Sequence, residues 1–339
     1  MRSRAASLAL LLFFAAATAF FCVAAPGFAK TSTFENLMAG YSFMAILAMG
    51  QAFPILVRGI DLSIGAIVAL VGMVVFDLSL IFHLTGPIVL ALGVLTGVLA
   101  GAVNGILVVG LRLQPFIATL ATLASYRGLV YAISGRQLVP ELSTKPITDP
   151  WITGIEAYYN VGSWLGLPKG ILPWFPLSFF LMLALFAVLQ ILLRWTRFGR
   201  DLYALGGNAE AARLAGIRVG ALTIAAYAIA GFCAGIAALI MVARFTTATE
   251  QLGVGMELTA IAAAVIGGVS LVGGTGSMFG PMLGAFLLGV VLIGLTLMGI
   301  PQFVQQIITG VILLAAISYD RLLLVLRRRR MQVSAGDQP

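Results

Sequence analysis

The chain has 339 residues, of which 61% are hydrophobic and 9% are charged, and its mean hydropathy is +1.08. Soluble domains carry about one-quarter charged residues, so a water-soluble fold could not bury this much apolar surface, and we expect most of the chain to lie in lipid. The net charge of +8 comes from basic residues that flank apolar segments, which indicates orientation in a membrane rather than nucleic-acid binding.

Ten apolar segments follow one another along the chain, each close to the ~20 residues that cross the hydrocarbon core. The first follows Arg2 and Arg4 and resembles a signal peptide, but its length favours an uncleaved membrane helix. Glycine and proline near 54–65 and 272–281 predict broken or partly re-entrant helices. We therefore expect an all-α polytopic protein, with a single transmembrane domain over 1–330 and a disordered tail at 331–339. The ten segments cover residues 5–25, 37–57, 62–82, 87–111, 116–134, 175–193, 221–243, 256–272, 281–299 and 301–319.

Lysine and arginine divide unequally between the two sides of this predicted bundle. Ten spans with both termini on one side leave only Lys30, Arg136, Lys145, Lys169 and Arg244 on the other side. By the positive-inside rule the arginine-rich side is cytoplasmic, which predicts a multi-pass protein of a bacterial inner membrane. The charge bias alone leaves open a cleaved form with its amino terminus outside. The cytoplasmic set is Arg2, Arg4, Arg58, Arg112, Arg194, Arg197, Arg200, Arg213, Arg218, Arg321, Arg327, Arg328, Arg329 and Arg330.

Two longer connections lie outside the predicted spans. Residues 135–174 carry charges, prolines and tryptophans, and they predict a folded external loop whose aromatic side chains lie at the headgroup level. Residues 194–220 form a cytoplasmic loop.

The cytoplasmic loop predicts a short helix at 209–215. Asn208 is a good N-cap, and Glu210 lies in the first turn, where a carboxylate favours the helix dipole. Arg213 is within pairing reach of Glu210, and Gly216 is a natural stop. Because two turns of helix are not stable alone in water, this segment needs a partner surface. The residues alone leave two interpretations, a charged connector on the membrane or a docking helix for a cytosolic partner.

Four motifs resemble those of one family, the ribose-type (monosaccharide) ABC importer permeases. Gly59-Ile-Asp-Leu-Ser-Ile-Gly65 is similar to the family's Gly-Gly-Ile-Asp-Leu-Ser-x-Gly signature, with Arg58 in place of the first glycine. Residues 114–120 with Arg127 and Gly128 resemble its Pro-Phe-Ile-x-Thr-Leu segment. Residues 257–268 and 273–276 resemble its carboxy-terminal signature. The cytoplasmic loop is similar to the family's coupling loop at Gly199, Ala204, Gly206, Asn208, Ala211, Ala212, Gly216 and Ile217.

The resemblance implies a non-catalytic permease subunit of a bacterial ATP-binding-cassette importer for a pentose, a hexose or a related polyol. The implied partners are a second permease subunit, identical or related, two cytosolic ATPase domains and a periplasmic sugar-binding protein. ATP and Mg would be used by the ATPase, and this subunit would need no cofactor. A short cytoplasmic helix would insert into a cleft of the ATPase. The residues expected to make this coupling contact are Asn208, Ala209, Glu210, Ala211, Ala212, Arg213, Leu214, Ala215 and Gly216.

Polar residues inside the predicted spans suit a passage for a neutral, polyhydroxylated solute, although helix–helix hydrogen bonds explain each of them equally well. For Asp61, a cap of the next helix with help from Ser63 is favoured over a direct role in transport. Asp77 either pairs with Arg127 or lies near the external interface. The candidate path residues are Gln51, Asp61, Ser63, Asn104, Thr119 and Thr122.

Glycine recurs every fourth residue in two stretches of the chain. Glycine lets helix backbones approach closely in lipid, and packing within one subunit is favoured over a dimer seam. The segment 274–280 lacks the lysine and the spacing of a phosphate-binding loop, so it predicts a helix break. The first set is Gly93, Gly97, Gly101 and Gly105, and the second is Gly276, Gly280 and Gly284.

Other classes of protein fit the sequence less well. A branched-chain amino-acid-type ABC permease is the first alternative, but the 59–65 signature and the coupling loop favour a sugar. An ion-coupled secondary transporter often needs ionisable relays within its spans, and this chain has few. An intramembrane enzyme finds no support. The chain has one histidine, His83, and two cysteines in apolar runs, Cys22 and Cys233. It therefore lacks the residues for most hydrolytic triads and zinc sites.

Overall fold

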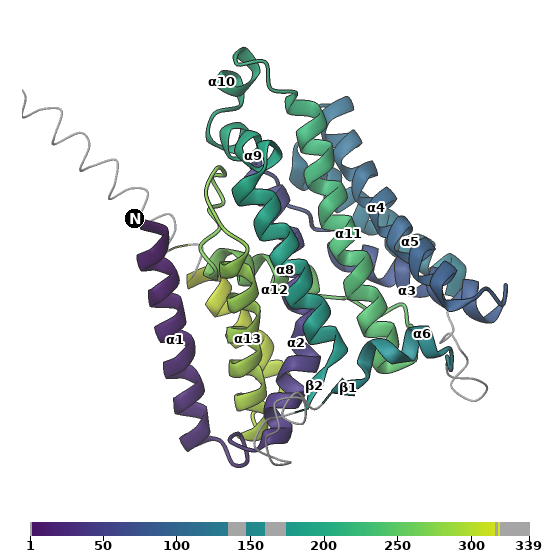
Figure 1. Cartoon of the computed structure of the whole chain (residues 1–339), viewed down its shortest axis with the longest axis vertical. Helices are drawn as coiled ribbons and strands as arrows, with labels where there is room; N and C mark the ends of the chain where they lie inside the picture. Colours follow the sequence, from purple (N-terminus) through teal and green to yellow (C-terminus); the bar gives the residue numbers. More distant parts are fainter. Residues whose placement is uncertain (1, 135–146, 160–173, 316–317, 319–339) are drawn as a thin grey trace, which may run out of the picture.

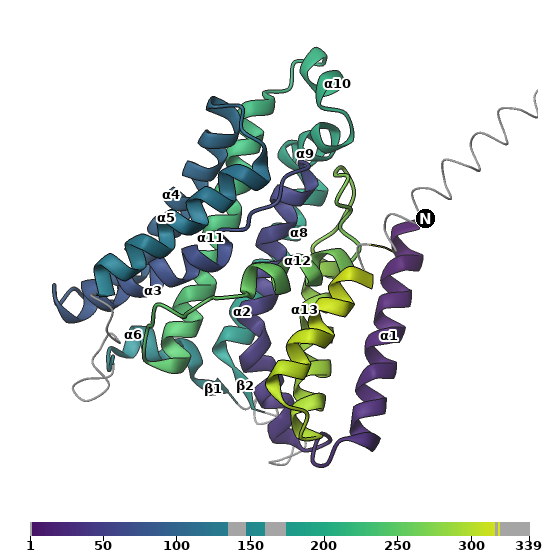
Figure 2. The ribbon, with the colours of Figure 1, turned by 180° about the vertical axis from the view of Figure 1, so that it is seen from behind.

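The computed structural model describes residues 2–134, 147–159, 174–315 and 318, which form a bundle of helices (Figures 1 and 2). Within these ranges, six helices are long and apolar enough to cross a membrane, and four shorter apolar helices accompany them. The predicted all-helical polytopic class is therefore confirmed. The six are α2 (Thr31–Leu56), α4 (Gly86–Gly110), α5 (Pro115–Ser134), α8 (Leu177–Trp195), α11 (Val219–Phe245) and α13 (Phe279–Leu297). The shorter ones are Leu8–Ala24 within α1 (Arg2–Ala24), α3 (Ile64–Leu80), α12 (Met256–Ile266) and Gln302–Ala315.

Small elements occupy the two ends of the bundle (Figure 1). One end carries α9 (Arg197–Gly207) and α10 (Ala209–Leu214), and the start of α1 lies at the same end. The opposite end carries α6 (Pro150–Thr153), the 3-10 helix η1 (Gly154–Glu156) and the antiparallel strands β1 (Tyr158–Tyr159) and β2 (Phe175–Pro176). The two loops predicted to face opposite sides of a membrane thus lie at opposite ends.

Part of the predicted external loop and all of the predicted tail lie outside the described residues. In the described part of the loop, Tyr158 pairs with Pro176 across the two short strands. Glu156 of η1 lies 3.6 Å from Arg244 near the end of α11, which fastens this region to the bundle.

Helices α4 and α11 pack backbone to backbone through glycine. A Cβ atom at Gly97 would meet the carbonyl oxygen of Gly231 and lie 3.0 Å from the Cα atom of Gly235. A Cβ atom at Gly101 would meet the carbonyl oxygen of Tyr227. Since both helices belong to one chain, the first glycine series is a packing face within the subunit, as predicted.

The second glycine series packs α13 against α12. Gly280 lies on the backbone of Gly267, and Gly284 lies on the backbone of Ala263. The intervening residues 267–278 are not helical, which confirms the break predicted near 272–281. With 11 residues, α12 rises about 16 Å, roughly half of the hydrocarbon thickness. A second break separates α2 from α3 at residues 57–63, where the sequence also predicted one.

Candidate functional site

Helices α9 and α10 form what we call the platform, residues 197–214. Asn208 joins the two helices, and its Oδ1 accepts hydrogen bonds from the backbone N–H of Glu210 at 3.0 Å and of Ala211 at 3.1 Å. The predicted N-cap is therefore confirmed. Arg213 and Glu210 form the predicted ion pair at 2.7 Å. Gly216, with a φ of +80°, ends the segment in the left-handed conformation that glycine adopts without strain.

The exposed surface of α10 differs from the expected one at a single residue. Leu214 is 81% exposed, and Ala211 and Ala215 are also exposed, but Ala212 is only 4% exposed. Because α10 packs against α9, one position per turn must face inward, and Ala212 takes it. Ala212, one of the residues expected to make the coupling contact, therefore faces inward, and Leu214 is the large apolar side chain that α10 exposes.

Arg58 fastens the platform to the end of α2. Its Nε donates a hydrogen bond to the carbonyl oxygen of Gly206 at 2.7 Å, and its Nη2 donates to the carbonyl oxygen of Gly207. The last carbonyls of a helix lack partners within the helix, and a cation there favours the helix dipole. Arg58 therefore caps α9 from another part of the chain. The sequence departs from the family signature at this residue, and its backbone takes a φ of +66°, a conformation that suits glycine.

The platform is also fastened to the loop that precedes α13. The hydroxyl of Tyr203 donates to the carbonyl oxygen of Gly276 at 2.8 Å, and burial raises the pKa of Tyr203, so the hydroxyl keeps its proton. Gly206 packs directly on Gly274, whose N–H donates to the carbonyl oxygen of Leu56 at 2.9 Å. A displacement of α9 must therefore move the end of α2 and the 267–278 loop, unless these contacts break.

A buried polar cluster lies in the break between α2 and α3. The Oδ1 of Asp61 accepts from the backbone N–H of Ser63 at 2.9 Å and from its hydroxyl at 2.7 Å. The Nδ2 of Asn104 donates to the Ser63 hydroxyl at 2.7 Å and lies 3.3 Å from both Asp61 oxygens. All three side chains are fully buried. The cluster therefore ties the break to α4.

The other candidate path residues are also buried. The hydroxyl of Thr119 lies 2.9 Å from the carbonyl oxygen of Pro115 in its own helix and 3.1 Å from that of Ile60, which places α5 against the same break. Thr122 donates only along its own helix, to the carbonyl oxygen of Thr119 at 3.2 Å. Gln51 is fully buried, and neither polar atom of its side chain has a hydrogen-bond partner among the described residues. The structure thus gathers Asp61, Ser63, Asn104 and Thr119 at one break.

The structure corrects the expectation about Asp61 and excludes one of the two alternatives for Asp77. The N-cap residue of α3 is Ser63, and Asp61 fixes the turn before the helix instead of capping it. Arg127 donates to the carbonyl oxygens of Glu250 at 2.9 Å and Leu252 at 2.7 Å, and no ion pair joins it to Asp77. Backbone carbonyls in the connection before α12 satisfy this guanidinium, so no carboxylate partner is needed.

Three residues that hold the platform in place were not singled out as functional from the sequence. Arg58 and Tyr203 act on backbone atoms remote in sequence, and no local pattern indicates those partners. Thr196 is different, because its hydroxyl accepts from the backbone N–H of Gly199 at 3.2 Å as the N-cap of α9. A threonine just before a helical segment is a signal that could have predicted this helix. Across the described ranges, no group of three or more His, Cys, Asp or Glu residues is placed to hold a metal ion.

Comparison with known proteins shows which family and which relatives the chain resembles. Residues 33–317 match the family described as "Branched-chain amino acid transport system / permease component". The chain is 34% identical over 301 residues to the ribose import permease protein RbsC of Haemophilus influenzae, with 88% of each chain covered. It is 35% identical to the protein of the same name from Escherichia coli K12, with 87% of each covered. It is 36% identical to the D-allose transport system permease protein AlsC of Escherichia coli K12, with 87% of this chain and 85% of that one covered. No solved structure gives a significant match.

Proposed function

This chain belongs to the permease-component family of branched-chain amino acid transport systems, and from that premise we propose that it is the membrane subunit of an ABC importer for a monosaccharide. The family description names amino acids, but the relatives that match over most of both chains are named for ribose, D-allose and autoinducer 2. These names favour a sugar over a branched-chain amino acid. The subunit itself carries out no ATP hydrolysis in this account.

The observation that carries the proposal is the exposed helix α10 on a platform fastened to the bundle. Leu214 is a large apolar side chain almost fully exposed at the arginine-rich end, next to the Glu210–Arg213 ion pair. Burying a leucine is worth about 1.5–3 kcal/mol, which favours a protein surface as its environment. In this account a cytosolic ATPase supplies that surface, and a second permease subunit and a periplasmic sugar-binding protein complete the transporter.

Coupling follows from the contacts of the platform. When the ATPases close on ATP, they displace α10 and with it α9. Arg58 and Tyr203 carry the displacement to the end of α2 and to the 267–278 loop. The cluster of Asp61, Ser63 and Asn104 lies in the break that starts beside Arg58, so the break, α4 and α5 move together. Differential binding of the ATPase to two arrangements of the bundle supplies the driving free energy.

The topology belongs to the same proposal. Ten crossings of the membrane, made by the six long helices and by the four segments that contain the shorter apolar ones, place both termini in the cytoplasm. The occurrence of α10 and the start of α1 at one end of the bundle supports this arrangement (Figure 1). Among the candidate path residues, Asp61, Ser63, Asn104 and Thr119 act in transport by fixing the shape of the break at 57–63.

Reconstituted transport tests the substrate class. Proteoliposomes containing the subunit, its ATPase and its binding protein should accumulate a labelled pentose or hexose when ATP is enclosed, and leucine should not compete. A matched preparation without enclosed ATP is the control. ATP-driven accumulation of leucine, with no uptake of any monosaccharide, would show that the chain is the permease of an amino-acid importer.

A further inference from the structure

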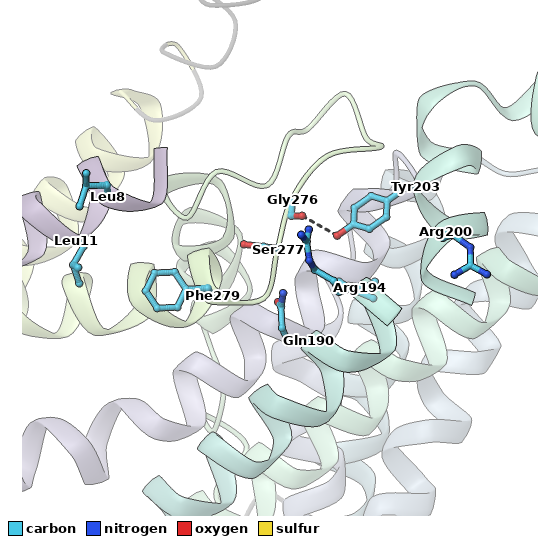
Figure 3. Close-up of a pocket in the computed structure, with 10 residues that line it drawn as sticks. Leu8, Leu11, Gln190, Arg194, Arg200, Tyr203, Gly276, Ser277 and Phe279 are labelled. Carbon is cyan, nitrogen blue, oxygen red and sulfur yellow. Dashed lines mark hydrogen bonds between the residues drawn. The ribbon is translucent and has the colours of Figure 1, made fainter. Parts of the chain in front are cut away.

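A cavity of about 710 Å³ lies beside the platform, between α1, α8, α9 and the start of α13 (Figure 3). Two of its lining residues, Arg194 and Arg200, are cationic, and neither forms an ion pair within the part of the chain that the structure describes. The cavity has no assigned role in coupling, and the chemistry of its lining indicates what would fill it.

One part of the cavity is polar and offers hydrogen-bond donors. Arg194 extends from the last turn of α8 towards Gly276 and Ser277, while Arg200 lies at the far side on α9 (Figure 3). The Oε1 of Gln190 accepts from the backbone N–H of Met278 at 3.0 Å, which leaves its amide N–H₂ group to donate. Guanidinium groups bind phosphate oxygens with charge-assisted hydrogen bonds.

The other part of the cavity is apolar. Leu8 and Leu11 of α1 line it, and Phe279, at the first turn of α13, lies between them and Arg194 (Figure 3). Arg194 marks the end of a membrane helix, which is the depth of the lipid headgroups, and the apolar wall lies across the cavity from it (Figure 3). A ligand with an anionic head and an apolar tail fits both parts.

We propose that this cavity binds an anionic phospholipid of the cytoplasmic leaflet, with its phosphate at Arg194 and its acyl chain along Leu8, Leu11 and Phe279. A zwitterionic lipid fits less well, because its ammonium group would enter a site that already carries two guanidinium groups. A free anion such as inorganic phosphate would leave the apolar wall uncovered. Basic pockets between membrane helices on the cytoplasmic side are suited to anionic headgroups.

The cavity contacts the platform through Tyr203, which lines the cavity and also donates a hydrogen bond to the carbonyl oxygen of Gly276. A bound phosphate would therefore hold α8, α9 and the 267–278 loop together. This consequence for coupling rests on the proposed function, but lipid binding itself does not. A direct binding measurement on the full chain separates the two.

Native mass spectrometry of the purified full-length subunit tests the proposal, with phosphatidylglycerol and phosphatidylethanolamine of matched acyl chains as probes. We expect phosphatidylglycerol to bind more tightly, and Arg194→Gln to weaken it about fivefold, the effect of about 1 kcal/mol per arginine. Arg194→Lys should retain most of the preference. Arg197→Gln is the matched control, because this exposed arginine lies on α9 outside the cavity lining.

Three results would overturn the proposal. The first is equal binding of the two lipids by the wild type. The second is an equal effect of Arg194→Gln and Arg197→Gln. The third is displacement of phosphatidylglycerol by millimolar inorganic phosphate, which would assign the site to a free anion. Binding of phosphatidylethanolamine by Arg194→Gln at the wild-type level would establish that the variant is folded.

Discussion

Arg58 and Gly206 lie 148 positions apart in the chain, yet the Nε of Arg58 donates to the carbonyl oxygen of Gly206 at 2.7 Å. The bond joins the end of α2 to the end of α9, directly before the helix α10. Arg58 makes this contact from a backbone with a φ of +66°. The contact therefore combines a stabilising hydrogen bond with a local conformational cost.

This combination predicts an order of stability among variants. Arg58→Met removes the donors and keeps the strained backbone, and it should lose about 2 kcal/mol. Arg58→Gly loses the same bonds but recovers about 1 kcal/mol, because glycine adopts a positive φ without strain. Thermal unfolding in detergent should therefore rank wild type above Arg58→Gly and Arg58→Gly above Arg58→Met. The exposed Arg218→Met is the control, and a Met variant at position 58 as stable as the wild type would contradict the capping role.

The α4–α11 contact predicts that Gly101 tolerates no side chain. Gly101→Ala would place a methyl group against the carbonyl oxygen of Tyr227 and 3.0 Å from the Cα atom of Gly231. Overpacking of this kind costs about 1–3 kcal/mol, and leucine at Gly97 or Gly101 should prevent folding. Gly110→Ala, on the same helix but with open space around it, is the matched control. Equal yields of monodisperse protein from Gly101→Ala and Gly110→Ala would argue against backbone contact.

The polar cluster predicts unequal effects of two substitutions. Asn104→Ala removes the donor to Ser63 and Asp61, and it should destabilise the subunit by about 1–3 kcal/mol. Thr122→Val removes a hydroxyl that binds only its own helix and should be nearly neutral. Folded abundance and the thermal midpoint measure both. Equal midpoints for the two variants would mean that the cluster does not hold the 57–63 break in place.

Glu156 predicts a pH dependence of stability. Burial raises the pKa of its carboxyl, although Arg244 at 3.6 Å opposes the shift. The folded state then holds the proton more tightly than the unfolded state, so the stability from this group is present below its ordinary pKa of 4.5 and is lost as pH rises through the folded value. Glu156→Gln should reduce the fall of the thermal midpoint with rising pH above about pH 4.5.

A profile unchanged by Glu156→Gln, with the midpoint measured between about pH 4.5 and 7, would mean that the Glu156 carboxyl does not titrate differently in the two states.

Local chemistry explains which features the sequence predicted. Asn208 caps α10 through N–H groups two and three residues away, and Gly216 ends the segment through its own φ, so both follow from neighbours in the chain. The apolar segments are equally local, because length and hydropathy decide whether a helix spans lipid.

Contacts between distant segments explain what the sequence could not predict. The inward orientation of Ala212 depends on how α10 lies against α9, and the role of Arg58 depends on where α9 ends in space. Arg127 is a further case, since a cation among apolar residues suggests a carboxylate partner, whereas two backbone carbonyls of a folded connection satisfy it. The glycine series predicted close packing, but not that Gly231 and Gly235 are the surface they meet.

The central claim is that α10 is where the ATPase binds, and co-purification of the tagged ATPase with the subunit tests it most directly. Leu214→Asp places a charge where an apolar contact is expected, and we predict at least about a tenfold loss of bound ATPase, equivalent to about 1.4 kcal/mol. Membrane abundance should be normal, since Leu214 is 81% exposed. Leu111→Asp, at a 65% exposed leucine just after α4, should retain the ATPase. Retention of the ATPase and normal sugar uptake by Leu214→Asp would contradict the account.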